Sequence, residues 1–450
     1  MSTRFKLTDR NQHYMFPPTI DDWLPENHLA RFVVDIVGQL DIHALTESYR
    51  GSGSKAYHPE ILLSLLFYGY ATGVYSSRKI EKATYDSVAF RYISADTHPD
   101  HDTIASFRKR FLKELKPLFK QILLLCHEMG IVKLGKVSLD GTKIKANASK
   151  HHALSWDYAC KLEEQLQSEV DELMHLAEKA DEEEVPEGVN IPDELSRRRD
   201  RLAAIAEAKA KLEKRAEERY EREQKEYEEK QKQRTSKENG KPRGRSPKPP
   251  QPGPRGKDQI NLTDEESRIM PSSGKGFEQS YNAQASVDIA TMLIVGSHVS
   301  QSSNDKKEIE TALSVIKDLP DELGTVTSLL ADAGYFSADN VSACEKQTIE
   351  PYISPGRNKH NEPLWERFTS PEELPENADM VAIMKYKLKT PEGRMLYAKR
   401  KCTVEPVFGI IKHVMGFRQF LLRGLDAVSG EWDLVSIAWN IKRMFILSQA

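Results

Sequence analysis

The sequence predicts a mixed α/β protein that has an all-helical N-terminal part and a helical hairpin inserted into its sheet-forming part. Apolar residues recur at helical spacing through the first 130 residues. Between residues 275 and 353, short apolar runs alternate with amphipathic stretches, which is typical of a mixed sheet flanked by helices. A long charged helical stretch separates the first predicted strand from the others.

The composition limits the class of protein. The chain has 450 residues, with 65 Lys and Arg against 68 Asp and Glu, which is long enough for two or three domains. No apolar run reaches the ~18 residues that span a bilayer, and the first residues lack the apolar segment of a secretory signal. The four cysteines stand far apart, so no disulfide framework is expected. We therefore expect a cytoplasmic protein without a membrane partner.

Two stretches are strongly basic. Residues 385–423 hold ten Lys and Arg against two acids, and residues 234–257 hold eight against one. Stretches of this kind have two interpretations: they bind a polyanion such as a nucleic acid, or they are ordinary solvated surfaces.

Residues 1–130 form the predicted helical N-terminal domain. One helix starts at Pro59, a second is capped by Ser76, and a third starts near Asp102 and ends at Gly130. This part is either a helix-turn-helix type DNA-binding domain or a helical subdomain with a basic surface. Its basic residues are Arg78, Lys79, Arg91, Arg108, Lys109 and Arg110.

The rest of the chain divides by composition and pattern. The sheet-forming domain is split into residues 131–154 and 275–425, and residues 155–233 form an antiparallel helical hairpin between the two parts. Residues 234–274 are predicted to be a basic, Pro-rich, disordered linker. A C-terminal helix is expected over residues 426–450.

Two predicted strands end in an aspartate. Asp140 follows V-S-L and precedes Gly141, and Asp332 follows T-S-L-L-A and precedes Ala-Gly. Ligands collect at the carboxyl edge of open α/β sheets, so these two side chains are expected to lie close together there. Because neighbouring carboxylates repel each other, a hard divalent cation such as Mg²⁺ would stabilise the pair. Each aspartate taken singly is also a common turn residue.

Glu405 is the only acid between Arg394 and Arg423. It lies on a predicted helix whose apolar stripe is Val404, Val407, Phe408 and Ile411. Lys412 follows two turns later on nearly the same face. Glu405 is either a site residue or the salt-bridge partner of the surrounding cations, and Pro406 either starts this helix or kinks it.

Four motifs in this order resemble the DDE transposases of bacterial insertion sequences, whose catalytic domain has the RNase H-like fold. The first two are V-S-L-D-G-T-K at 137–143 and L-L-A-D-A-G-Y at 329–335. The third is the block Y-x-x-R-x-x-x-x-E-x-x-x-x-x-x-K from Tyr397 to Lys412. The fourth is the N-terminal run Y-H-P-E-I-L-L-S-L-L-F-Y-G-Y, with S-S-R-K-I-E and D-x-T-I-A-x-F-R after it.

The resemblance implies roles for particular residues. Asp140, Asp332 and Glu405 would be the catalytic triad, holding Mg²⁺ or Mn²⁺, expected as two ions. Tyr397, Arg400 or Lys401, and Lys412 would contact DNA. Arg400 and Lys401 are both candidates for the DNA-contacting cation. In the family three residues separate this cation from the glutamate, and here Lys401 has that spacing whereas Arg400 has four residues.

The resemblance also implies an activity. The protein would cleave DNA at the terminal inverted repeats of an insertion sequence and transfer the strand to target DNA, as a homodimer associated with the bacterial nucleoid. An alternative is a catalytically inactive, domesticated transposase that retains DNA binding. A further alternative is an interaction protein built around the charged hairpin, in which the acids are turn residues.

Overall fold

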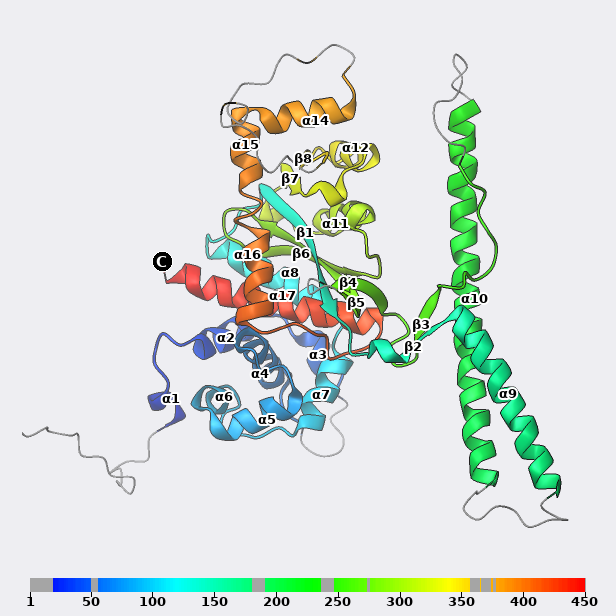
Figure 1. Cartoon of the computed structure of the whole chain (residues 1–450). Helices are drawn as coiled ribbons and strands as arrows, with labels where there is room; N and C mark the ends of the chain where they lie inside the picture. The colour runs from blue at the N-terminus through cyan, green and yellow to red at the C-terminus, as the bar shows by residue number, and fades with distance from the viewer. Residues whose placement is uncertain are drawn as a thin grey trace, which may run out of the picture. The chain divides into compact units, whose positions relative to one another are not determined.

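A computed structural model describes residues 19–49, 56–179, 191–235, 247–272, 276–356, 365, 374 and 378–449 (Figure 1). The chain forms two compact units. The first consists of residues 1–145 and 281–450, and the second is the insertion, residues 146–280. In the described ranges, no helix has the length and apolar character that crossing a bilayer requires.

The N-terminal part of the first unit is helical, as predicted. Two of the three predicted helices are broken: extended backbone at Ser87 separates α5 from α6, and a turn at residues 111–114 separates α7 from α8. Asp100, not Asp102, caps α7 by accepting the Thr103 N–H at 2.7 Å. The helices are α1 (Ile20–Trp23), α2 (Leu29–Gly38), α3 (His43–Glu47), α4 (Pro59–Thr72), α5 (Ser77–Asp86), α6 (Val88–Ile93), α7 (His101–Arg110) and α8 (Leu115–Glu128).

A six-stranded mixed sheet follows, with strand order β4-β5-β1-β7-β8 and β6 paired with β5. The strand β7 is parallel to both β1 and β8, whereas β5 is antiparallel to β4 and β6. The strands are β1 (Lys136–Lys145), β4 (Arg268–Ser272), β5 (Gly276–Asp288), β6 (Ile294–Ser300), β7 (Ser328–Ala331) and β8 (Glu350–Ile353).

The elements around the sheet complete the first unit. The longest, α17, contacts β6 as well as the N-terminal helices α4 and α8. The N-terminal helices therefore share one compact unit with the sheet, although the sequence predicted a separate domain. These elements are η2 (Asp305–Lys307), α11 (Glu308–Lys317), η3 (Asp321–Leu323), η4 (Ala333–Tyr335), α12 (Ala338–Lys346), α14 (Met380–Lys389), α15 (Pro391–Ala398), α16 (Val404–Gly409), η5 (Ile410–Val414) and α17 (Leu425–Ser448).

A buried polar network fastens α17 to the N-terminal helices. Glu431 of α17 accepts a hydrogen bond from the Tyr70 hydroxyl at 2.9 Å, and this hydroxyl accepts one from Arg108 at 3.0 Å. The other Glu431 oxygen accepts the N–H groups of Leu421 and Leu422. Burial raises the pKa of Glu431, and these donors and Arg108 oppose the rise. Arg108, one of the predicted basic surface residues, is thus a core residue only 8% exposed.

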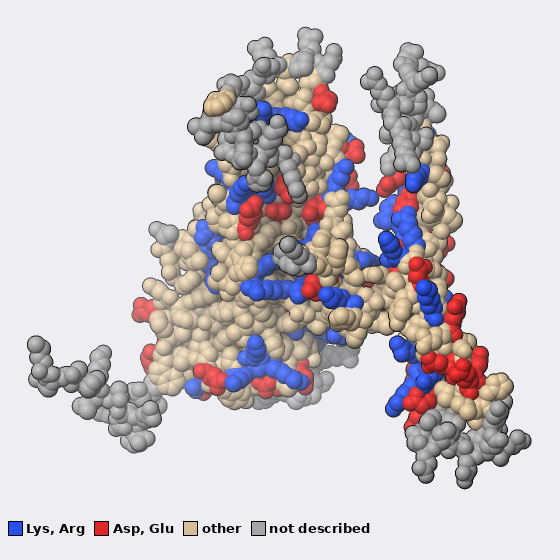
Figure 2. Space-filling view, viewed as in Figure 1, with Lys and Arg blue, Asp and Glu red and all other residues tan. Residues whose placement is uncertain are grey.

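The insertion unit is a long helical hairpin with a small two-stranded sheet. Helices α9 (Trp156–Lys179) and α10 (Ile191–Thr235) run antiparallel, since Glu169 pairs with Arg198 and Glu163 pairs with Lys209. Both signs of charge are exposed along these helices (Figure 2). The other elements are η1 (Lys150–His152), β2 (Ala153–Ser155) and β3 (Gln259–Asn261). The core is Leu154, Ala159, Leu166, Ile205, Ala208, Leu212 and Ile260.

The segment predicted as a disordered linker, residues 234–274, is largely structured where it is described. Residue 234 and residue 235 belong to α10, and residues 247–272 include β3 and β4, whereas 236–246 and 273–275 lie outside the described residues. Ion pairs to α10 anchor the Pro-rich part: Arg219 binds Asp258 at 2.7 Å, and Arg255 binds Glu223 at 2.8 Å. Composition does not reveal such long-range pairs, which is why that prediction was wrong here.

The Glu431 network yields a stability prediction. Glu431→Ala would remove the acceptor of the Tyr70 hydroxyl and of two backbone N–H groups, and it would remove the negative charge near the buried Arg108. We therefore expect a loss of about 3–5 kcal/mol in the free energy of unfolding. Glu431→Gln retains an acceptor oxygen and should lose less. Urea denaturation of both variants measures this. A loss below about 1 kcal/mol for Glu431→Ala, the size of a surface effect, would contradict the role of the network.

Candidate active site

The register of β1 and β7 brings two aspartates level with each other. The parallel pairing includes Val137 with Leu329 and Ser138 with Leu330. Two residues further along the chain from the last pair stand Asp140, on β1, and Asp332, directly after β7. Side chains two residues apart on a strand lie on the same face. Asp140 and Asp332 are therefore expected on the same faces as the paired residues Ser138 and Leu330. The predicted closeness of these two acids is supported by this register.

Asp140 and Gly141 do not form the turn that the sequence suggested, because β1 runs on to Lys145. A glycine is needed at position 141 for a different reason. A Cβ at position 141 would overlap the Gln284 amide and lie 2.8 Å from Asp305 Oδ1. Gly141 therefore lets side chains from β5 and η2 pack directly on the backbone beside Asp140.

Asp332 is a turn residue, which is one of the two interpretations of the sequence. Its Oδ1 accepts the Gly334 N–H at 2.7 Å and caps the short helix η4. The turn therefore fixes the orientation of a carboxylate that stands at the end of a buried strand.

Arg400 links the third acid to the first. Its guanidinium contacts Asp140 Oδ2 at 3.4 Å and Glu405 Oε1 at 3.2 Å, and its side chain is only 11% exposed. Glu405 is thus a salt-bridge partner, one of the two interpretations of the sequence, and the same cation holds it toward Asp140. Residues more than 260 positions apart in the chain meet at one guanidinium.

The helix that carries Glu405 starts here rather than being kinked. Thr403 is the N-cap of α16, so Pro406 falls within the first turn, where its missing N–H removes no helical bond. The predicted stripe is buried, and the π-helix η5 continues α16. At this turn the Lys412 Nζ donates to the Lys143 carbonyl of β1 at 2.9 Å. Burial lowers the pKa of Lys412, and the Lys143 charge adds to the effect.

The other predicted DNA-contacting residues are placed differently. The half-buried Tyr397 ring lies 5.9 Å from the Arg400 guanidinium carbon, which is a cation–π arrangement. Lys401 is exposed. Of the two cations that the motif left open, Arg400 is therefore the one that reaches the acids.

Several carboxylates influence the pKa values of two groups at this site. Burial raises the pKa of Asp140 to about 7, and repulsion by Asp332 and Asp305 adds to the rise, against the Gly141 N–H and Arg400. The pKa of the buried Tyr335 hydroxyl also rises well above its usual value, through burial and the charges of the same three acids.

Asp305 is a site residue that the sequence analysis missed. It lies in η2, after β6, and its neighbour Asn304 caps that short helix. The signal was present: Asn-Asp follows an apolar strand, much as the motif that contains Asp332 does. The Ser-rich segment before it obscured the end of the strand.

The donor set suits a hard divalent cation. Asp140, Asp332, Glu405 and Asp305 offer only oxygen ligands, and their charge exceeds that of the nearby cations Arg400 and Lys143. Carboxylate oxygens are the ligands that Mg²⁺ prefers. In the portion of the chain that the structure describes, no three acids, histidines or cysteines are grouped so that they could hold a metal ion, and the Arg400 guanidinium contacts two of the acids.

Fold and site together define a mixed α/β domain with an acidic site at adjoining parallel strands. Comparison with family models assigns residues 18–110 to a transposase domain of the DUF772 type and residues 250–441 to a transposase DDE domain. The chain belongs to the DDE transposases of insertion sequences, which are nuclease- or transposase-type enzymes. Searches of curated proteins and of solved structures gave no significant match.

The family match and the structure contribute different acids to the site. The DDE domain match contains Asp332 and Glu405, whereas Asp140 lies on β1, ahead of the insertion and outside both matches. The strand register and the Arg400 contact are what associate Asp140 with the other two.

The raised pKa of Asp140 predicts a pH dependence of the metal-free protein. The folded-state pKa of about 7 exceeds the unfolded value, so the folded state retains a proton that the unfolded state releases between about pH 4 and pH 7. Stability from this group is therefore present at low pH and is lost as the pH rises through that window.

Asp140→Asn removes this titration. Relative to wild type, we expect the variant to gain on the order of 2 kcal/mol in the free energy of unfolding on going from about pH 5 to about pH 8. Urea denaturation in EDTA at both pH values measures the difference. If the free energies of unfolding of variant and wild type differ by the same amount at both pH values, the raised pKa of Asp140 is contradicted.

Proposed function

We propose that this transposase cleaves DNA at the ends of an insertion sequence and joins the released 3′ ends to target DNA. Two observations support the proposal: the β1–β7 register sets Asp140 level with Asp332, and Arg400 contacts both Asp140 and Glu405. The central strand β1, with β7 and β8 on one side and β5 and β6 on the other, supports an RNase H-like fold.

Asp140, Asp332 and Glu405 would hold the divalent cation, Mg²⁺ or Mn²⁺ and expected as two ions. Such cations, when bound, supply an activated water and stabilise charge on the phosphate oxygens. Asp140, whose pKa is raised to about 7, would have to be deprotonated to serve as a ligand. Arg400, which contacts Asp140 and Glu405, would stabilise the charge of the DNA phosphate.

Other residues would bind the DNA. The exposed Lys401 is suited to a backbone phosphate, and Tyr397 and Lys412 support the segment that carries Arg400 and Glu405. We assign recognition of the terminal inverted repeats to the helices within residues 1–130. Because two ends must be joined, we propose a homodimer that acts on DNA in the bacterial nucleoid.

Alanine substitution of the acids tests the proposed chemistry. Asp140→Ala, Asp332→Ala and Glu405→Ala should each lower Mg²⁺-dependent nicking of duplexes carrying the terminal inverted repeats by about 10³-fold or more, because each removes a ligand. Gel shifts with the same duplexes in EDTA should change little. Asp258→Asn, which breaks the ion pair with Arg219 in the insertion, is the control and should cut normally.

Two outcomes of this experiment count against the proposal. Nicking that survives all three substitutions would show that the acids are not the catalytic triad. Specific binding of the ends by the wild-type protein, without cleavage in Mg²⁺ or Mn²⁺, would instead identify an inactive, domesticated transposase.

The neighbouring cations should separate chemistry from binding. Arg400→Ala should lower the nicking rate by about 100-fold, with end binding changed only slightly. Lys401→Ala should instead weaken binding about 2- to 5-fold and reduce the salt dependence by about one phosphate contact. Nicking rates and gel shifts at several salt concentrations measure both effects. The reverse pattern would assign the catalytic role to Lys401.

A further inference from the structure

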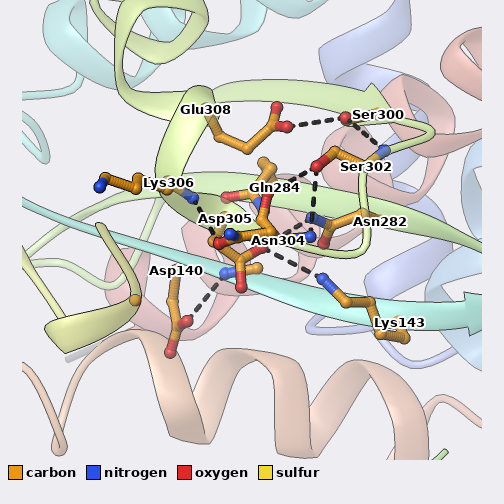
Figure 3. Close-up of polar contacts among 12 residues, drawn as sticks. Asp140, Lys143, Asn282, Gln284, Ser300, Ser302, Asn304, Asp305, Lys306 and Glu308 are labelled. Carbon is orange, nitrogen blue, oxygen red and sulfur yellow. Dashed lines mark hydrogen bonds and ion pairs between the residues drawn. The ribbon is translucent and has the colours of Figure 1, made fainter. Parts of the chain in front are cut away.

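Asp305 makes more contacts than a surface acid needs. Its Oδ1 accepts hydrogen bonds from Asn282 Nδ2 at 2.6 Å and Gln284 Nε2 at 2.8 Å, and it pairs with Lys143 Nζ at 3.1 Å. Asn282 and Gln284 stand two residues apart on β5 and are fully buried, and Lys143 belongs to β1. Figure 3 shows this group together with Asp140 on the same strand as Lys143. One carboxylate oxygen thus ties two strands together.

The same group reaches the turn that carries Asp332. Gln284 uses its other amide atom, Oε1, to accept the hydroxyl of Tyr335, the last residue of η4. Asp305 Oδ2 lies 4.0 Å from the position that a Cβ would take on Gly334 in this turn. The buried Asn340 amide joins the two turns by donating to the carbonyls of Lys306 at 2.7 Å and Tyr335 at 2.6 Å.

The group also packs on the backbone beside Asp140. A Cβ at Gly141 would overlap the Gln284 amide and approach Asp305 Oδ1. Asp305, Asn282, Gln284, Lys143 and Tyr335 therefore form what we name the Asp305 clamp, which contacts the chain next to both Asp140 and Asp332.

We infer that Asp305 is a positioning residue of the active site, which fixes the relative placement of Asp140 and Asp332 through the Asp305 clamp. The inference rests on the proposed function. Outer-shell partners of metal ligands commonly affect metal affinity about 10- to 100-fold, and a misplacement of about 1 Å can slow a reaction about 100-fold. If Asp305 only stabilised the fold, its substitution would reduce the amount of folded protein but would change neither the metal affinity nor the reaction rate of the protein that is folded.

The test compares three variants of the full chain. Asp305→Ala removes the acceptor for all three donors. Asp305→Asn retains an amide oxygen for Asn282 and Gln284 but loses the charge that binds Lys143. Asp433→Asn is the matched control: it alters a half-buried aspartate that accepts the hydroxyl of Ser297, a residue outside the clamp, at 2.7 Å.

Two readouts are taken on folded protein. Mn²⁺ affinity is measured from the rise in Tm with Mn²⁺ concentration. The rate of nicking is measured with DNA duplexes that the variants and wild type bind equally well in EDTA. For Asp305→Ala we expect Mn²⁺ affinity about 10-fold weaker and nicking about 100-fold slower. Asp305→Asn should fall between this variant and wild type, and Asp433→Asn should match wild type in both.

Wild-type Mn²⁺ affinity and nicking in Asp305→Ala would overturn the inference, and so would losses no larger than those of Asp433→Asn. The Mn²⁺ titration keeps this test separate from the proposed function. If wild type binds Mn²⁺ but cuts no DNA, the proposed function fails, and weaker Mn²⁺ binding by Asp305→Ala still supports the clamp. Equal Mn²⁺ binding by the two proteins, or none by wild type, overturns it.

Discussion

The crowding of half-buried carboxylates, where Asp140 of β1 lies near Asp332 and Asp305, is the constraint on which the rest of the site depends. Burial is the largest cause of the raised pKa of Asp140, and repulsion by Asp332 and Asp305 adds to it. The fold offsets the cost of this crowding locally, with the Gly141 N–H and Arg400 near Asp140 and with three donors on Asp305. A site arranged in this way holds more negative charge than its own cations neutralise, which favours the entry of an external cation.

Such crowding requires a rigid support, and the first unit supplies it through α17. The Trp432 indole of this helix donates to the backbone carbonyl of Gln284 at 2.9 Å. The side chain of the same glutamine binds Asp305. One residue earlier, Glu431 joins the network of Tyr70 and Arg108. The N-terminal helices, α17 and the strand β5 therefore form one continuous packed support for the site.

The sequence predicted the parts of this arrangement that follow from local patterns. The apolar strand segments that precede Asp140 and Asp332 and the buried stripe around Glu405 are visible as periodicity. What it could not predict depends on tertiary contacts. Gly141 resembles a turn residue and is instead a place of close approach, and Asp305 becomes part of the site only through donors from two other strands.

The spacing of the third motif shows the same limit of local rules. In one continuous helix at about 100° per residue, Lys401 would lie about 40° from Glu405 and Arg400 about 140° away, so Lys401 would be the partner. The structure breaks the helix instead: α15 ends at Ala398 and α16 begins at Val404. Within the intervening turn, Arg400 points inward to the acids and Lys401 is exposed, because helical spacing does not apply across a turn. The extra residue between arginine and glutamate is therefore compatible with the same pairing of cation and acid.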